Sequence, residues 1–246
     1  MRFRRAAIVG AATAALALLG TTATVVAFPF GVAAACPGCY GLERFSGNTF
    51  IERSASPQQR ARVAAVLEQA RNRVAGFYGD LQTQPRILVC VSDGCYQKIR
   101  YVGSRGNAFG DLALELSPRG IDPVTAAHEL SHMELHHRIG LIRYFLGAIP
   151  SWFDEGLAVV VSDDPRYLRP AGGADRCKVR SDEALPTGIM EWAHAIGPDD
   201  RNQLYAKAAC RVADWIKTKG GAKAVLRLVA RVSGGTPFAE AYGAED

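Results

Sequence analysis

The feature that most constrains this chain is an uncharged, mostly apolar run over residues 6–27, preceded by three arginines within residues 1–5. About 20 apolar residues suffice for one helical crossing of a bilayer, whereas the apolar region of a cleavable signal is usually about 7–15 residues long. The arginines favour a cytoplasmic N-terminus. We therefore expect residues 1–35 to form a membrane anchor and residues 36–246 to form one extracytoplasmic domain, either periplasmic or extracellular.

The end of the apolar run leaves alternatives open. Ala33, Ala34 and Ala35 are small residues that suit a cleavage site just before Cys36. Cleavage there would make the domain a secreted protein, and a lipid on Cys36 would be a third outcome. The length of the run favours an uncleaved anchor.

Charge separates the two parts of the chain in the same way. The whole chain has 29 Lys and Arg against 24 Asp and Glu, but three of the basic residues and none of the acidic ones precede residue 36. The domain is therefore nearly neutral and lacks the basic surplus that phosphate binding requires. This argues against a nucleic acid partner. About 210 residues are enough to bury one hydrophobic core.

Six cysteines follow the apolar run and none precedes it. An even number on the side expected to be oxidising indicates disulfide bonds. Proximity in the sequence favours the pairs Cys36 with Cys39, Cys90 with Cys95, and Cys177 with Cys210, although sequence alone does not determine the pairing. A redox role for the first pair is the alternative, but no thioredoxin-like pattern surrounds it.

Hydrophobic periodicity predicts an α+β domain with a helical C-terminal half. Strands are expected at residues 48–53, 86–91 and 111–117. Helices are expected at residues 57–79, 123–140, 150–161, 201–219 and 222–232. Residues 163–198 have no sustained period, so we expect them to form a long surface loop that could line a site.

Four of the five histidines lie within residues 128–137, and two of them frame the run His128-Glu129-Leu130-Ser131-His132. Positions i and i+4 share one face of a helix, so His128 and His132 can bind the same metal ion. Glu129 lies one residue further round and can act on a water molecule beside that ion. A catalytic zinc ion also needs a third protein ligand and an open position.

The same helix does not offer that third ligand. His136 lies about 6 Å of rise beyond His132, which is too far along an intact helix. We expect His136 and His137 to form the solvated polar end of the helix. A Glu from a following helix is the other route, and the run Trp152-Phe153-Asp154-Glu155-Gly156-Leu157-Ala158 contains one.

These two runs together resemble the gluzincins, zinc peptidases that have an HExxH helix and a downstream Glu ligand in a Trp-x-x-Glu-Gly-x-Ala context, as in peptidase-MA-like members. The resemblance covers about residues 109–243. It implies a zincin-like fold in which a small mixed sheet supports the active-site helix, with Glu155 as the third zinc ligand. It also implies that Gly156 lets the second helix approach the first. Asp154 could orient a zinc-binding histidine or simply favour the start of a helix.

The resemblance implies a role for two further stretches. Leu112, Ala113 and Leu114 lie where such peptidases have an edge strand that pairs with an extended substrate, although an ordinary core strand is equally compatible. Tyr205 opens a helix where peptidase-MA-like proteins carry a Tyr that stabilises the oxyanion. His194 is the competing donor, and a core or rim position is the alternative for Tyr205.

The sequence therefore predicts a zinc-dependent peptidase outside the cytoplasm, with Glu129 as general base. Peptides or proteins are the expected substrates, and the membrane is the expected partner of the N-terminal helix. The main alternative is a catalytically silent, zinc-stabilised binding module with the same fold. M1-like exopeptidases have a Gly-x-Met-Glu-Asn stretch before the zinc helix, and this chain has no match to it, which favours cleavage within chains.

Overall fold

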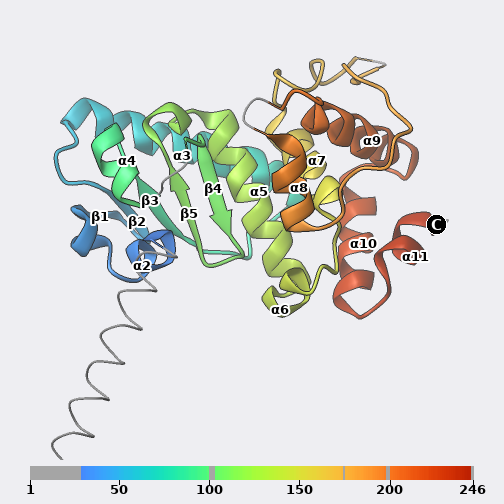
Figure 1. Cartoon of the computed structure of the whole chain (residues 1–246), viewed down its shortest axis with the longest axis horizontal. Helices are drawn as coiled ribbons and strands as arrows, with labels where there is room; N and C mark the ends of the chain where they lie inside the picture. Colours follow the sequence, from blue (N-terminus) through green and yellow to red (C-terminus); the bar gives the residue numbers. More distant parts are fainter. Residues whose placement is uncertain (1–28, 100–102, 174, 198–199, 245–246) are drawn as a thin grey trace, which may run out of the picture.

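The computed structural model describes residues 29–99, 103–173, 175–197 and 200–244. The predicted anchor over residues 6–27 lies outside these residues. Among the described residues, no helix combines the length and the apolar character needed to cross a bilayer. Figure 1 shows a sheet at one side of the domain and a helical C-terminal half at the other, with helix α5 (Pro123–Ile139) between them.

The sheet is mixed and has five strands in the order β1-β2-β3-β5-β4. The strands are β1 (Leu42–Ser46), β2 (Thr49–Glu52), β3 (Arg86–Val89), β4 (Gly106–Phe109) and β5 (Ala113–Leu116). β2, β3 and β5 run parallel, whereas β1 and β4 pair antiparallel with their neighbours at the two edges. The mixed sheet was predicted; β1 and β4 were not recognised as strands.

The predicted edge strand is therefore an internal strand. β5, which contains Ala113 and Leu114, lies between β3 and β4, and β4 occupies the edge. Every residue of β5 is buried, because both of its sides are paired and both of its faces are covered. Leu112 precedes the strand and is exposed. The expectation that residues 112–114 form an edge is wrong, and β4 takes that position.

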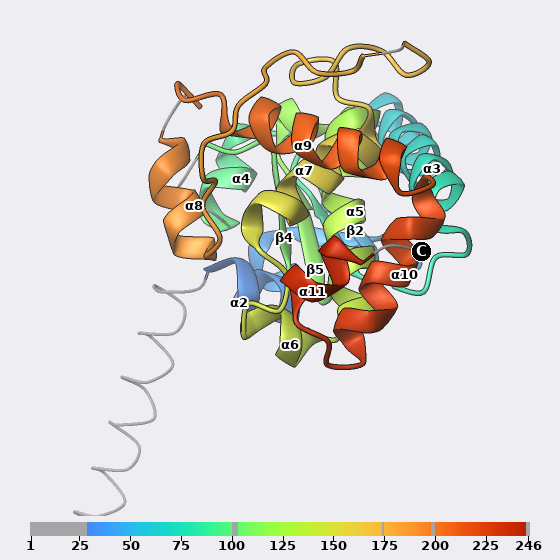
Figure 2. The ribbon, with the colours of Figure 1, turned by 90° about the vertical axis from the view of Figure 1, so that its right-hand side faces the viewer.

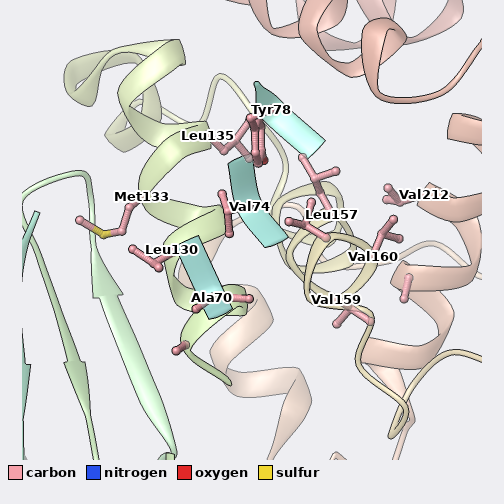
Figure 3. Packing of buried hydrophobic residues seen from close by; sticks show 14 of the residues in the cluster. Ala70, Val74, Tyr78, Leu130, Met133, Leu135, Leu157, Val159, Val160 and Val212 are labelled. Atoms are coloured by element: carbon pink, nitrogen blue, oxygen red, sulfur yellow. The ribbon is translucent and has the colours of Figure 1, made fainter. Parts of the chain in front are cut away.

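Three long helices form the centre of the domain. Helix α3 (Pro57–Tyr78) begins at a capping box. The Ser56 hydroxyl accepts a hydrogen bond from the backbone N–H of Gln59, and the Gln59 side-chain oxygen accepts one from the backbone N–H of Ser56. α5 packs against α3, β4, β5 and α7 (Ser151–Ser162). Figure 3 shows Leu130 and Met133 of α5 among the buried apolar side chains of this core. The central helix is thus held on several sides, which fixes the direction of its polar side chains.

The C-terminal half closes over α7. It comprises α9 (Leu204–Thr218), α10 (Ala222–Ser233) and α11 (Phe238–Gly243), which Figure 2 shows in front of α7. Gly156 allows the close approach of α7 to α9, because a Cβ atom there would lie 2.6 Å from the carbonyl oxygen of Ala208. The expectation that Gly156 faces the zinc-motif helix is therefore wrong.

The region expected to be one long loop contains a helix, α8 (Ile189–Ile196), in which Trp192 is buried. Its few residues are too short a stretch for periodicity to stand out. Besides α2 (Pro29–Ala35), the described residues form four further short elements. They are η1 (Pro37–Tyr40), α4 (Asp93–Ile99), η2 (Pro118–Gly120) and α6 (Leu141–Phe145).

Helix α2 (Pro29–Ala35) belongs to the folded domain and corrects the predicted boundary at residue 35. Phe30 and Ala33 are buried in a second apolar cluster with residues of β3 and α4. Arg86 of β3 donates a hydrogen bond to the carbonyl oxygen of Ala34. The three alanines at residues 33–35 are therefore part of a helix that packs on the domain.

All six cysteines form disulfides, in the pairs that proximity in the sequence favoured. Cys36–Cys39 closes the turn after α2, Cys90–Cys95 joins the end of β3 to α4, and Cys177–Cys210 ties the long connection to α9. No described cysteine is free.

Candidate metal centre and cleft

Helix α5 presents the two histidines of the HExxH run on one face. Asp122 caps the start of the helix, and its carboxylate accepts hydrogen bonds from the amides of Val124 and Thr125. The ring centroids of His128 and His132 are 4.7 Å apart, and their Nε2 atoms are 3.1 Å apart. Two ring nitrogens thus point at one common position.

Helix α7 brings Glu155 to the same position. Its Oε2 atom lies 3.4 Å from the Nε2 atom of His128 and 3.4 Å from that of His132. Ligands of a tetrahedral zinc ion with bonds of about 2.0–2.1 Å lie about 3.3 Å apart. The three ligand atoms therefore have the spacing of three corners of such a site.

The buried Glu155 Oε2 atom at this position has no hydrogen-bond partner among the described residues, and neither has His128 Nδ1 on the other side of that ring. Burial alone would raise the pKa of Glu155, but the neighbouring His132 and His128 lower it to about 2. Glu155 is thus a carboxylate over the physiological pH range. A buried anion with an unsatisfied oxygen facing two imidazoles suits a bound cation.

Asp154 orients His132 through the ring nitrogen that faces away from Glu155. Its Oδ1 atom lies 2.6 Å from His132 Nδ1, which leaves His132 Nε2 directed at Glu155. Burial would raise the pKa of Asp154, but His132 and His136 hold it well below its usual range. In the metal-free protein the same ion pair raises the pKa of His132, against the effect of burial.

His136 is buried, so the expectation of a solvated helix end is wrong for this residue. Its Nε2 atom is 2.7 Å from Asp154 Oδ2, and its Nδ1 atom is 2.9 Å from the carbonyl oxygen of Gly110. Helix α6 covers it, with the Tyr144 ring stacked 3.6 Å away. Both ring nitrogens of His136 therefore face oxygen atoms. His137, in contrast, is exposed and forms a hydrogen bond with Asp111.

His132, His136 and Asp154 form a second cluster with suitable metal-ligand atoms. The separations of 2.6 and 2.7 Å between the carboxylate and the two imidazoles are those of strong hydrogen bonds. This cluster and the first one share His132, whose two nitrogens face opposite ways. We therefore interpret Asp154 and His136 as the support of His132 and the first cluster as the metal site.

Glu129 lies next to the metal position, in a cavity between α5, the start of β4 and α9. The cavity is lined by Ser104, Arg105, Gly106, Thr125, His128, Glu129, Arg166, Tyr167 and Tyr205. A Cβ atom on Gly106 would lie 2.8 Å from Glu129 Cγ and 2.9 Å from Glu129 Oε1. The absence of a side chain at the first residue of β4 therefore leaves room for the Glu129 carboxylate.

Tyr205 lies across the cavity from α5. Its ring centroid is 6.2 Å from that of His128 and 5.0 Å from that of Tyr167, on which it stacks. Burial, with the charges of Glu155 and Glu129 nearby, raises the pKa of Tyr205 well above its usual value. Tyr205 is therefore a neutral phenol that can donate a hydrogen bond. His194, the competing donor, is exposed on α8 and does not line this cavity.

Six of the nine cavity residues were not named from the sequence. Two of them, Arg166 and Tyr167, come from the stretch expected to be a long surface loop. Buried Asp164 accepts two hydrogen bonds from Arg166 Nε and one from Arg166 Nη2, and so holds the guanidinium in place. Gly106 gave no signal either, since only its distance from Glu129 in space reveals its role. The expectation that the loop over residues 163–198 could line a site was the one available indication for Arg166 and Tyr167.

Comparisons with protein-family models, with curated proteins and with solved structures found no match to this chain.

Proposed function

We propose that this protein is a zinc-dependent peptidase that hydrolyses peptide bonds outside the cytoplasm. The observation that carries the proposal is the convergence of His128 Nε2, His132 Nε2 and Glu155 Oε2 at 3.1–3.4 Å, with Glu129 beside them. Two imidazoles and one carboxylate are a common ligand set of catalytic zinc. Zinc bound there would polarise a carbonyl group and lower the pKa of a water molecule to about 7.

The protein groups around this position supply the remaining chemistry. Glu129 is placed to accept a proton from the attacking water and to return it to the leaving amine. Tyr205 supports the developing oxyanion by donating its phenolic hydrogen. Because burial raises the pKa of Tyr205 well above its usual value, Tyr205 keeps that hydrogen at neutral pH.

β4 is the proposed binding strand for the substrate. It forms the edge of the sheet and begins at Gly106, beside Glu129. An extended peptide can add to such an edge as one more strand through backbone hydrogen bonds. Pairing of this kind recognises the peptide backbone and would place a scissile bond close to the Glu129 carboxylate.

The proposed location is outside the cytoplasm, with residues 6–27 as a membrane anchor. Three disulfides in a domain of this size are compatible with an oxidising compartment. The apolar run ends just before Pro29, the first residue of α2. The whole domain would then lie on one side of the membrane, next to its surface.

The proposal is tested with the variants Glu129→Gln, Glu155→Ala and, as a matched control on the exposed face of α3, Glu68→Gln. Bound zinc is measured by mass spectrometry and hydrolysis with a fluorogenic peptide library. We expect Glu129→Gln to retain zinc and lose hydrolysis, Glu155→Ala to lose zinc, and Glu68→Gln to behave as wild type. Full activity in Glu129→Gln contradicts the mechanism, and zinc binding without any hydrolysis by the wild type favours the silent binding module.

A further inference from the structure

One end of the domain carries a group of large apolar side chains that are exposed to solvent. Ile142 and Leu146 are 76% and 81% exposed, although each would be expected in a core. We call this group the α6 surface. It consists of Phe109, Leu112, Ile142, Phe145 and Leu146. Contiguous exposed apolar groups of this kind mark a binding surface for a protein or a membrane.

The α6 surface is continuous with helix α2. The Phe145 ring lies 5.8 Å from Phe109, and Phe109 lies 6.4 Å from Phe30 of α2. The turn between β4 and β5 packs against α6, because Gly110 lies directly against Leu141. Figures 1 and 2 both show α2 and α6 at the same end of the domain.

The position of α2 indicates what covers this surface. The uncharged run of residues 6–27 is separated from Pro29 by a single residue, Phe28. α2 is itself fixed to the domain by the burial of Phe30 and Ala33. With so short a connection, a bilayer that holds residues 6–27 must pass close to α2 and therefore close to the α6 surface.

We propose that the α6 surface inserts into the headgroup region of the bilayer that holds the anchor. This inference rests on the anchor included in the proposed function. Ile142, Phe145 and Leu146 would lie among the upper acyl chains, as the apolar face of an interfacial helix does. Arg143, exposed between them, would direct its charge toward lipid phosphates.

Docking of this kind sets the height of the cleft above the membrane. α5 rises about 1.5 Å per residue, so His128 and His132 lie about 10–17 Å from the end of α5 that meets α6. The cleft would then act on chain segments close to the membrane surface. Two attachments, the anchor and the α6 surface, would also restrict rotation of the domain.

The test uses nitroxide spin labels on the full chain in vesicles of phosphatidylcholine and phosphatidylglycerol. Single cysteines replace Ile142, Leu146 and, as a control on helix α3, the exposed Gln69. No described cysteine is free to react with the label. Power saturation compares collisions with oxygen, which concentrates in lipid, and with a water-soluble nickel chelate.

We expect labels at residues 142 and 146 to favour oxygen and the label at residue 69 to favour the nickel chelate. If the labels at all three positions collide more with the nickel chelate and the protein is recovered in the vesicles, the α6 surface does not insert, and the proposed anchor is not contradicted. Dipolar broadening between labels at residue 146 of different molecules assigns the surface to a second copy and also overturns it. Protein absent from the vesicles refutes the anchor itself.

Discussion

Gly106→Ala should move the proposed general base without touching the metal ligands. An added Cβ atom would lie 2.8 Å from Glu129 Cγ, whereas carbon atoms in contact are separated by about 3.5–4.0 Å. Glu129 must therefore shift by about 1 Å. A misplacement of that size at a reacting group costs about 100-fold in rate. The backbone of Gly106 is not in the left-handed region, so alanine brings no other strain.

The assay compares kcat/KM on a fluorogenic peptide, zinc content and Tm for Gly106→Ala and for Gly38→Ala, where a Cβ atom meets nothing within 4 Å. We expect a loss of about 100-fold in kcat/KM for Gly106→Ala only, at unchanged zinc content. Wild-type activity in Gly106→Ala would refute the proposed role of Glu129. A parallel loss of zinc and of Tm would show that the strand, and not the carboxylate, had moved.

Three further changes test the support of the site and the packing of α7. Asp154→Asn should weaken zinc binding by about 10–100-fold, measured by competition with a chelator, because the residue that orients His132 loses its charge. Gly156→Ala should lower the free energy of unfolding in urea by about 1–3 kcal/mol, because the added Cβ atom would meet the backbone of α9. Gly76→Ala, on the open face of α3, should instead raise it by about 0.5–1 kcal/mol, because alanine is the better helix former. In the metal-free protein, the pKa of Glu155 is lowered from 4.5 to about 2, so its ion pair stabilises the fold above about pH 4.5 and is lost as the pH falls toward 2. Against the effect of burial, Asp154 and then Glu155 raise the pKa of His132 well above 6.5, so the stability that His132 contributes is fully present below pH 6.5 and is lost as the pH rises through the raised pKa. Thermal melts of the wild type should therefore show a maximum between the acid and the alkaline loss, and Glu155→Gln should flatten the acid side of that profile most.

The elements that the sequence predicted well are those with a long internal pattern. The start of α3 at Pro57 and of α5 at Pro123 followed from a capping residue before a proline, which is a local signal. The i and i+4 spacing of His128 and His132 is likewise a property of one helix. Such features depend on residues within one or two turns of each other, so sequence alone suffices for them.

Other features depend on contacts between distant segments. The edge position of β4 requires its antiparallel pairing with β5, and nothing in residues 106–109 indicates that pairing. His136 looked like a helix end exposed to water because the covering residue, Tyr144, comes from the next helix. In both cases the local pattern was compatible with several environments, and tertiary packing selected one.

The orientation of Gly156 follows from that of the two residues before it. Successive residues of a helix point about 100° apart, and Asp154 and Glu155 both contact α5, so Gly156 points away from α5. Once Glu155 is assigned to a metal held by α5, Gly156 must face a different neighbour, which is α9. The pair of residues therefore joins three helices: Glu155 reaches the histidines of α5, and Gly156 lets α9 approach. Because α9 also carries Tyr205, the close contact at Gly156 helps to set the distance across the cleft, and Gly156→Ala should reduce hydrolysis as well as stability.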